Sequence, residues 1–133
     1  METVCDALET ITSIIRSALS AEAKVCYEFP GGGERAPIYR TTIATGVKKA
    51  AAAYEKQSDG SMKLHRSVTV EAVICAPKAA AGNGVVYLLD KILTAVMEAD
   101  GKTLTLEGFS SSPISYSTAV GALILPAYIT VKI

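Results

Sequence analysis

The spacing of apolar residues near the start of the chain predicts an amphipathic helix over Glu2–Ser20. Its apolar positions recur at intervals of three and four residues: Val4, Ala7, Leu8, Ile11, Ile14, Ile15 and Leu19. This spacing places them on one face of an α-helix, while Asp6, Glu9 and Ser13 fall on the opposite face. We therefore expect a surface helix that buries one apolar stripe.

The middle of the chain favours a long β-hairpin, although its first half carries two conflicting signals. Ile38–Ile43 is rich in strand-forming residues, whereas the run Ala50–Ala53 has helical intrinsic propensity. Ser58–Ser61 is a turn signal, and apolar residues alternate along the segment beyond it. We expect Ile38–Lys56 to pair with Met62–Ala76, so that strand pairing overrides the propensity of the alanine run.

A second amphipathic helix is predicted from Val85 to about Ala99, and Asp100-Gly101 ends it. The C-terminal strand contains Pro126, which we expect at a bulge or on an unpaired edge because proline donates no hydrogen bond. The predicted short strands are Val25–Phe29, Thr103–Phe109, a strand that starts at Ile114-Ser115-Tyr116, and Ala122–Ile133. These elements predict an α+β fold, an antiparallel or mixed sheet with a long hairpin packed against two amphipathic helices.

Length and composition are those of a single globular domain over residues 1–133. Half of the residues are apolar, which is enough for a sizeable core. Thirteen basic residues balance thirteen acidic ones, so the chain lacks the basic excess of a free nucleic-acid binder. The acidic start has no signal-peptide pattern, and the most apolar stretch, 119–131, is interrupted by Pro126 and is shorter than the ~20 residues of a membrane-spanning helix. We expect neither secretion nor a membrane partner.

Residues for covalent chemistry are sparse. The single histidine, His65, is expected to be solvated at a strand start, and an enzyme would have to use it as its base. Three cysteines without metal-ligand spacing indicate mostly buried, unpaired thiols in a reducing cytosol. Gly82-Asn83-Gly84 lacks the rest of a phosphate-binding motif. We therefore expect no enzyme, no metal and no cofactor.

The order of elements resembles the tail terminator, or tail-completion, proteins of contractile phage tails and of phage-like particles such as R-type bacteriocins. The resemblance is architectural and covers most of the chain, without a signature motif. It is carried by Ile11–Ile15, the glycine-rich loop before Ala36-Pro37-Ile38, Thr45-Gly46-Val47, Val68–Pro77, the Gly82 loop with the Val85–Met97 helix, Gly108-Phe109 and Ile114-Ser115-Tyr116. The resemblance implies a small α+β subunit that performs no covalent chemistry.

The family resemblance also implies a set of partners. The subunit would form a homo-oligomeric ring, usually a hexamer, on the head-proximal end of the tail tube, where it stops polymerisation. It would contact the tail tube protein, the collar or connector and, in contractile tails, the sheath; in a true phage, DNA would pass through the ring. It would assemble in the cytoplasm of the bacterial host and remain in the virion or tail-like particle.

The candidate interface residues are basic or lie in a glycine-rich loop: Gly31, Gly32, Gly33, Arg35, Arg40, Lys48 and Lys49. Four nearby positive charges can meet an acidic partner or nucleic acid, and Arg40, Lys48 and Lys49 are expected toward the channel of the ring. A head–tail connector or another small tail protein is an alternative within the same particle. A ligand-binding α+β domain, with a pocket between helices and sheet, is the alternative from another class.

Overall fold

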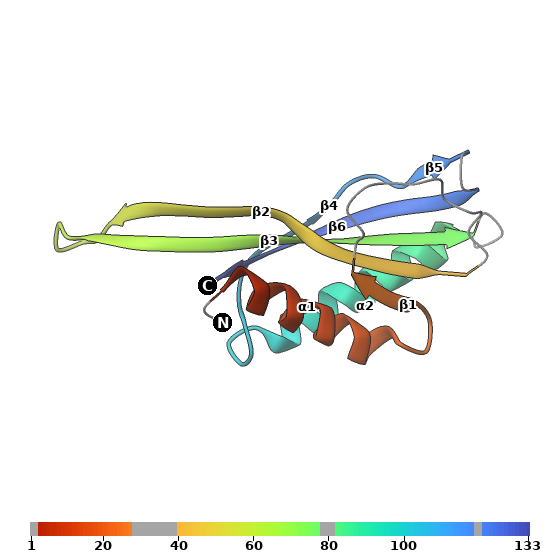
Figure 1. Ribbon diagram of the computed structural model, residues 1–133, viewed down its shortest axis with the longest axis horizontal. Helices are drawn as coiled ribbons and strands as arrows, with labels where there is room; N and C mark the ends of the chain where they lie inside the picture. The colour runs from red at the N-terminus through yellow and green to blue at the C-terminus, as the bar shows by residue number, and fades with distance from the viewer. Residues whose placement is uncertain (1–2, 28–39, 78–81, 119–120) are drawn as a thin grey trace.

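The computed structural model describes residues 3–27, 40–77, 82–118 and 121–133, and it shows two helices on one side of a six-stranded mixed sheet (Figure 1). The elements in chain order are α1 (Val4–Leu19), β1 (Lys24–Tyr27), β2 (Thr42–Lys56), β3 (Met62–Pro77), α2 (Gly82–Ala99), β4 (Thr105–Ser111), β5 (Ser115–Ser117) and β6 (Ala122–Lys132). The strand order is β1-β2-β3-β6-β4, and β5 also pairs with β6. The predicted α+β class and the long hairpin are confirmed.

Helix α1 begins and ends close to where the apolar spacing predicts. Thr3 caps its N-terminus by accepting a hydrogen bond from the Asp6 backbone N–H, and the Asp6 carboxylate accepts one from the Thr3 backbone N–H in return. This reciprocal capping box satisfies two backbone donors that the first turn would otherwise leave unpaired. Within the described residues of α2, every third or fourth side chain from Val85 through Leu88, Ile92 and Val96 is buried. Both helices are thus anchored by a stripe of apolar residues on the face toward the sheet.

The alanine run lies in a strand, as expected from pairing. β2 pairs with β3 along its whole length, in a register that sets Ala50 opposite Val68 and Lys56 opposite Met62. One register shift, between Val47 and Lys49, marks a β-bulge. Intrinsic helix propensity differs between residues by less than about 1 kcal/mol, so a continuous ladder of backbone hydrogen bonds outweighs it.

Pro126 is not at a bulge but lies on a stretch of β6 that is locally unpaired on one side, which is one of the two positions expected for it. It pairs with Val73 of β3 inside β6, and its carbonyl accepts a hydrogen bond from the Ser112 backbone N–H. In an antiparallel strand, the backbone N and C=O of one residue point to the same neighbouring strand. The backbone nitrogen of Pro126, which has no hydrogen to donate, therefore points toward the gap between β4 and β5, where no strand is paired with β6. The gap therefore accommodates the proline where no ladder bond is lost.

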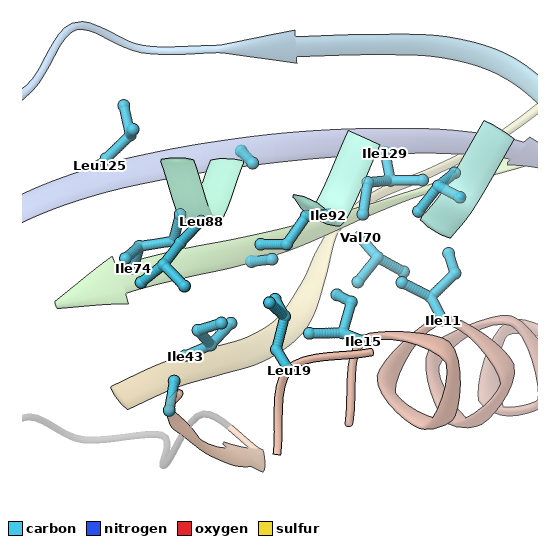
Figure 2. Close-up of a cluster of buried hydrophobic side chains, with 14 of the residues drawn as sticks. Ile11, Ile15, Leu19, Ile43, Val70, Ile74, Leu88, Ile92, Leu125 and Ile129 are labelled. Atoms are coloured by element: carbon cyan, nitrogen blue, oxygen red, sulfur yellow. The ribbon is translucent and has the colours of Figure 1, made fainter. Parts of the chain in front are cut away.

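The core lies between the helices and the sheet and is completely apolar at its centre. Ile11 and Ile15 of α1, Ile92 of α2, Val70 of β3 and Ile129 of β6 converge there, each with no exposed surface (Figure 2). Removal of each such side chain from water contributes roughly 1.5–3 kcal/mol. Among the described residues, these side chains fill the centre of the space between the helices and the sheet (Figure 2).

A buried pair of hydroxyl groups connects α1 to β2, the strand next to the edge strand β1. Thr12 Oγ1 lies 2.8 Å from Thr45 Oγ1, and the Thr45 hydroxyl also lies within hydrogen-bond distance, 3.4 Å, of the Cys26 carbonyl oxygen. Both threonine residues are fully buried. The pair therefore satisfies polar groups that would each carry a desolvation penalty if left alone.

We expect Thr12→Val to lower the free energy of unfolding by about 1–2 kcal/mol, because it removes one partner of this buried pair. The double variant Thr12→Val/Thr45→Val should cost less than the two single variants together, since neither hydroxyl is then left behind. Urea denaturation of the four proteins measures both quantities. Strictly additive costs would show that the two hydroxyl groups act independently.

Among the residues that the structure describes, no helix combines the length and the apolar character needed to cross a lipid bilayer.

Candidate interaction surface

The β2–β3 hairpin extends beyond the rest of the sheet. The pairing of β3 with β6 begins only at Ser67, which faces Lys132, so the residues of β3 before Ser67 have no partner in β6. On the other side, β1 pairs only with the first residues of β2. Residues 52–66 therefore form a two-stranded projection, here called the arm, which points away from the helices and the other strands (Figure 1). Its last backbone tie to the body is the hydrogen bond from the Ile133 N–H to the Arg66 carbonyl, 3.0 Å.

One face of the arm is apolar. The pairs Ala52–Arg66, Tyr54–Leu64 and Lys56–Met62 continue the row in which Ala50 faces the buried Val68. Side chains alternate along a strand, so these residues are on the helix side of the sheet. No helix covers them: Tyr54 is 70% exposed, Met62 59% and Leu64 46%. The alternation of apolar residues that builds the core thus continues along the arm, where these side chains are exposed to solvent.

The opposite face of the arm is polar. It carries Ala53, Glu55, Lys63 and His65, and the two charged residues face each other across the strands. An isolated two-stranded hairpin is marginally stable in water, and three strands or a packing partner are needed for independent stability. An arm with one exposed apolar face and one polar face is therefore a candidate interaction surface, because a packing partner on the apolar face would stabilise it.

His65 holds the root of the arm to the body. Its Nε2 lies 2.9 Å from the carboxylate of Glu107 in β4, and its side chain is only 23% exposed. The β4–β6 register shifts between Leu106 and Gly108, so Glu107 is the bulged residue and its side chain is directed out of the regular ladder. The expectation of a solvated His65 is wrong, because the bulge brings a residue 42 positions away into contact with the imidazole.

The tip of the arm is a turn held by Asp59. Its carboxylate accepts hydrogen bonds from the Ser61 backbone N–H at 2.9 Å and the Ser61 hydroxyl at 2.6 Å. Gly60 between them has φ +87°, a left-handed conformation that residues with a Cβ rarely adopt. The Ser61 hydroxyl and then the backbone N–H lower the pKa of Asp59 below its usual value.

We expect Ser61→Ala to raise the pKa of Asp59 toward its ordinary value, because the largest cause of the depression is removed. A depressed carboxyl pKa stabilises the turn above the ordinary pKa, and this contribution is lost as the pH falls through the lowered value. A carbon-detected NMR titration of the Asp59 carboxyl group measures the shift in both proteins. An unchanged midpoint would assign the depression to other groups.

The predicted interface residues are only partly brought together. Lys48 and Lys49 lie side by side at the bulge near the root of the arm, and Arg40 is exposed two residues before β2. Lys48 also interacts with two side chains of the sheet: its Nζ lies 3.8 Å from a carboxylate oxygen of Glu71 and 5.5 Å from the ring centre of Tyr128. Gly31, Gly32, Gly33 and Arg35 fall outside the described residues.

The helices present a second surface, an open groove between the second half of α1 and the end of α2. It has a volume of about 510 Å³, its walls include Ile14, Ala18 and Ala95, and Glu98 and Lys102 stand at its rim. The two helices carry a net negative charge. Over their full lengths α1 and α2 carry four acidic and two basic residues, a formal charge of −2.

Other candidate chemistry is limited. Among the described residues, no group of three or more histidine, cysteine or acidic side chains is placed to hold a metal ion. Of the cysteines, none of which is in a disulfide, Cys5 is exposed, contrary to the expectation of mostly buried thiols. Its Sγ lies 3.5 Å from Glu9, whose carboxylate raises the pKa of the thiol. The thiol is therefore held in its less reactive protonated form.

Sequence reasoning missed the apolar face of the arm. The signal was present in Met62-Lys63-Leu64-His65, which alternates apolar and polar residues, and in Tyr54 across the turn. The alternation alone predicts a half-buried strand. Only the three-dimensional arrangement shows that the hairpin extends past β6 and both helices, so that no other described element covers this face (Figure 1).

No protein-family model matches this chain, and no curated protein matches it at a significant level.

Proposed function

We propose that this chain is a structural, ring-forming subunit that caps the head-proximal end of a phage or phage-like tail tube, stops its polymerisation and joins the tail to a connector or collar. A head–tail connector subunit is the nearest alternative within the same particle. Assembly would take place in the cytoplasm of the bacterial host, and the subunit would remain in the finished particle. The proposal assigns the chain no catalytic step and no cofactor.

The arm is the observation that supports this proposal. Tyr54, Met62 and Leu64 form an exposed apolar row on a projection that the body of the same molecule does not reach. Burial of such a row stabilises an assembly by about 25 cal/mol for each Å² of apolar surface removed from water. A contact in which the arm of one copy meets a different surface of the next is head-to-tail, and a head-to-tail contact closes into a ring when its rotation allows.

The residues expected toward the channel fit the same arrangement. Arg40 and Lys49 are exposed polar groups at the start and at the root of the hairpin, outside the apolar row of the arm. A channel through which nucleic acid passes requires a solvated, polar wall. Lys48, near Glu71 and Tyr128, would add a partly exposed positive charge to such a wall.

The test is the mass of the protein by light scattering over a concentration series, followed by negative-stain imaging. We expect a concentration-dependent assembly of about six subunits with a central hole. The matched variant lacks Ala52–Glu55 and Lys63–Arg66, four residues from each strand, which keeps the turn and the alternation of hydrogen-bonded pairs. This shortened protein should fold and remain monomeric.

Two results would contradict the proposal. A full-length protein that stays monomeric at the highest concentration and forms no ring on added tail tubes has no capping function. A shortened protein that forms the same ring would show that the arm does not carry the assembly.

A further inference from the structure

The arm and the pair of helices differ in charge as well as in shape. The only charged residues on the apolar face of the arm are Lys56 and Arg66, both basic. The helices α1 and α2 together carry a formal charge of −2. The whole chain is neutral, so attraction between two copies comes from how the charges are divided between these surfaces.

Both surfaces also carry apolar side chains, but they differ in shape. The apolar face of the arm projects Tyr54, Met62 and Leu64, whereas the groove between the helices is a hollow with small or apolar walls at Ile14, Ala18 and Ala95. The groove has a volume of about 510 Å³ and is wide open to solvent, so side chains of a second molecule can reach its walls. A projecting surface and a groove therefore occur on the same molecule. The groove itself is lined by one acidic and one basic residue, Glu98 and Lys102, and the net negative charge belongs to the two helices as a whole.

The arm of one molecule does not reach its own groove. β2 crosses over β3 between the body and the tip, and the hairpin then runs away from both helices (Figure 1). The apolar face of the arm is on the helix side of the sheet, but the arm extends past the ends of both helices (Figure 1). Contact between the two surfaces therefore requires two molecules.

We propose that the apolar face of the arm docks into the α1–α2 groove of a second copy of this chain, with Tyr54 and Leu64 seated in the groove and Lys56 and Arg66 facing the helices, which carry a net negative charge. This inference rests on the self-association that the proposed function requires, and it adds which two surfaces meet. Because the two surfaces differ, each copy gives one arm and receives another. The contact repeats around a ring without leaving an arm unpaired, provided that the ring closes.

The experiment is cross-linking of engineered cysteine pairs with a short bismaleimide, in a Cys5→Ser background that removes the exposed native thiol. The test variant carries Leu64→Cys and Ala18→Cys. The control carries Lys63→Cys and Ala18→Cys, because Lys63 adjoins Leu64 and points to the opposite face of the arm. If Ala18→Cys is unstable, Ser17→Cys on the same groove replaces it in both proteins.

We expect a ladder of covalent oligomers from the test variant, with at least tenfold more product than from the control. Raising the salt concentration should weaken assembly, because the proposed contact joins a basic face to helices of net negative charge. A ladder supports the docking even if the rings never cap a tail tube, a result that would overturn only the proposed function.

Four outcomes would overturn the docking. Equal cross-linking of test and control would show that the arm contacts the groove with neither face preferred. Covalent dimers from Leu64→Cys alone would show that two arms pack on each other. A ladder from Leu64→Cys with Ile124→Cys, on the sheet face away from the helices, would place the arm on the sheet. Rings that give no product from the test pair would leave the proposed function standing and reject this contact.

Discussion

Replacing Tyr54 and Leu64 together by serine should weaken self-association by more than 100-fold and leave the body of the protein folded. The two side chains face each other across the arm and are the centre of its exposed apolar face. Buried interface residues of this kind each contribute about 2 kcal/mol or more when a few residues dominate binding. Light scattering over a concentration series gives the change in association constant.

The stability of the monomer should respond far less to the same replacement. A directly opposed aromatic–aliphatic pair contributes only about 0.2–1 kcal/mol to a hairpin, and the arm can open without unfolding the core. The matched control is Glu55→Ser/Lys63→Ser, the neighbouring opposed pair on the polar face. Equal loss of association in both double variants would contradict a one-sided interaction surface.

Ile129→Ala should lower the free energy of unfolding by about 2–5 kcal/mol. Ile129 lies in β6 with no exposed surface, between β3 on one side and β4 on the other, and the isoleucines of both helices lie close to it (Figure 2). Removing three carbon atoms there loses the transfer free energy of those atoms and leaves a cavity that a close-packed core cannot fully close. Urea denaturation measures the change.

Ile114→Ala is the control for that core substitution. Ile114 is 39% exposed in the turn between β4 and β5, so we expect its replacement to change the free energy of unfolding by no more than about 1 kcal/mol. If the Ile129 variant were no less stable than the Ile114 variant, the assignment of Ile129 to the centre of the core would be wrong.

Local patterns predicted the elements better than they predicted the surfaces. The spacing from Val4 to Leu19 and from Val85 to Val96 was sufficient for both helices, because each buries one continuous stripe. The hairpin was predictable in spite of Ala50–Ala53, since the alternation in β3 requires a paired strand. The burial of Thr12 was not predictable, because a single hydroxyl on a helix gives no sign of a partner 33 residues away.

The burial and exposure of residues on the interaction surface depend on segments that are distant in the sequence, which no local pattern reveals. His65 is half-buried because a bulge in β4 directs Glu107 toward it. Tyr54 and Leu64 are exposed because the hairpin runs past the end of β6 and beyond both helices, so that no helix covers this face (Figure 1). Where the neighbouring elements stop is a property of the whole fold. The basic residues selected from the sequence, Arg40, Lys48 and Lys49, lie near the arm but not on its apolar face.

β3 also couples the tip of the arm mechanically to the far end of the molecule. It is one uninterrupted strand from Met62 to Pro77, about 50 Å at the usual rise per residue. From Ser67 onward it is hydrogen-bonded to β2 on one side and β6 on the other. A pull along the arm therefore loads both ladders in shear, with many bonds sharing the force, so that a molecule held by its arm resists extension along the direction in which β3 runs.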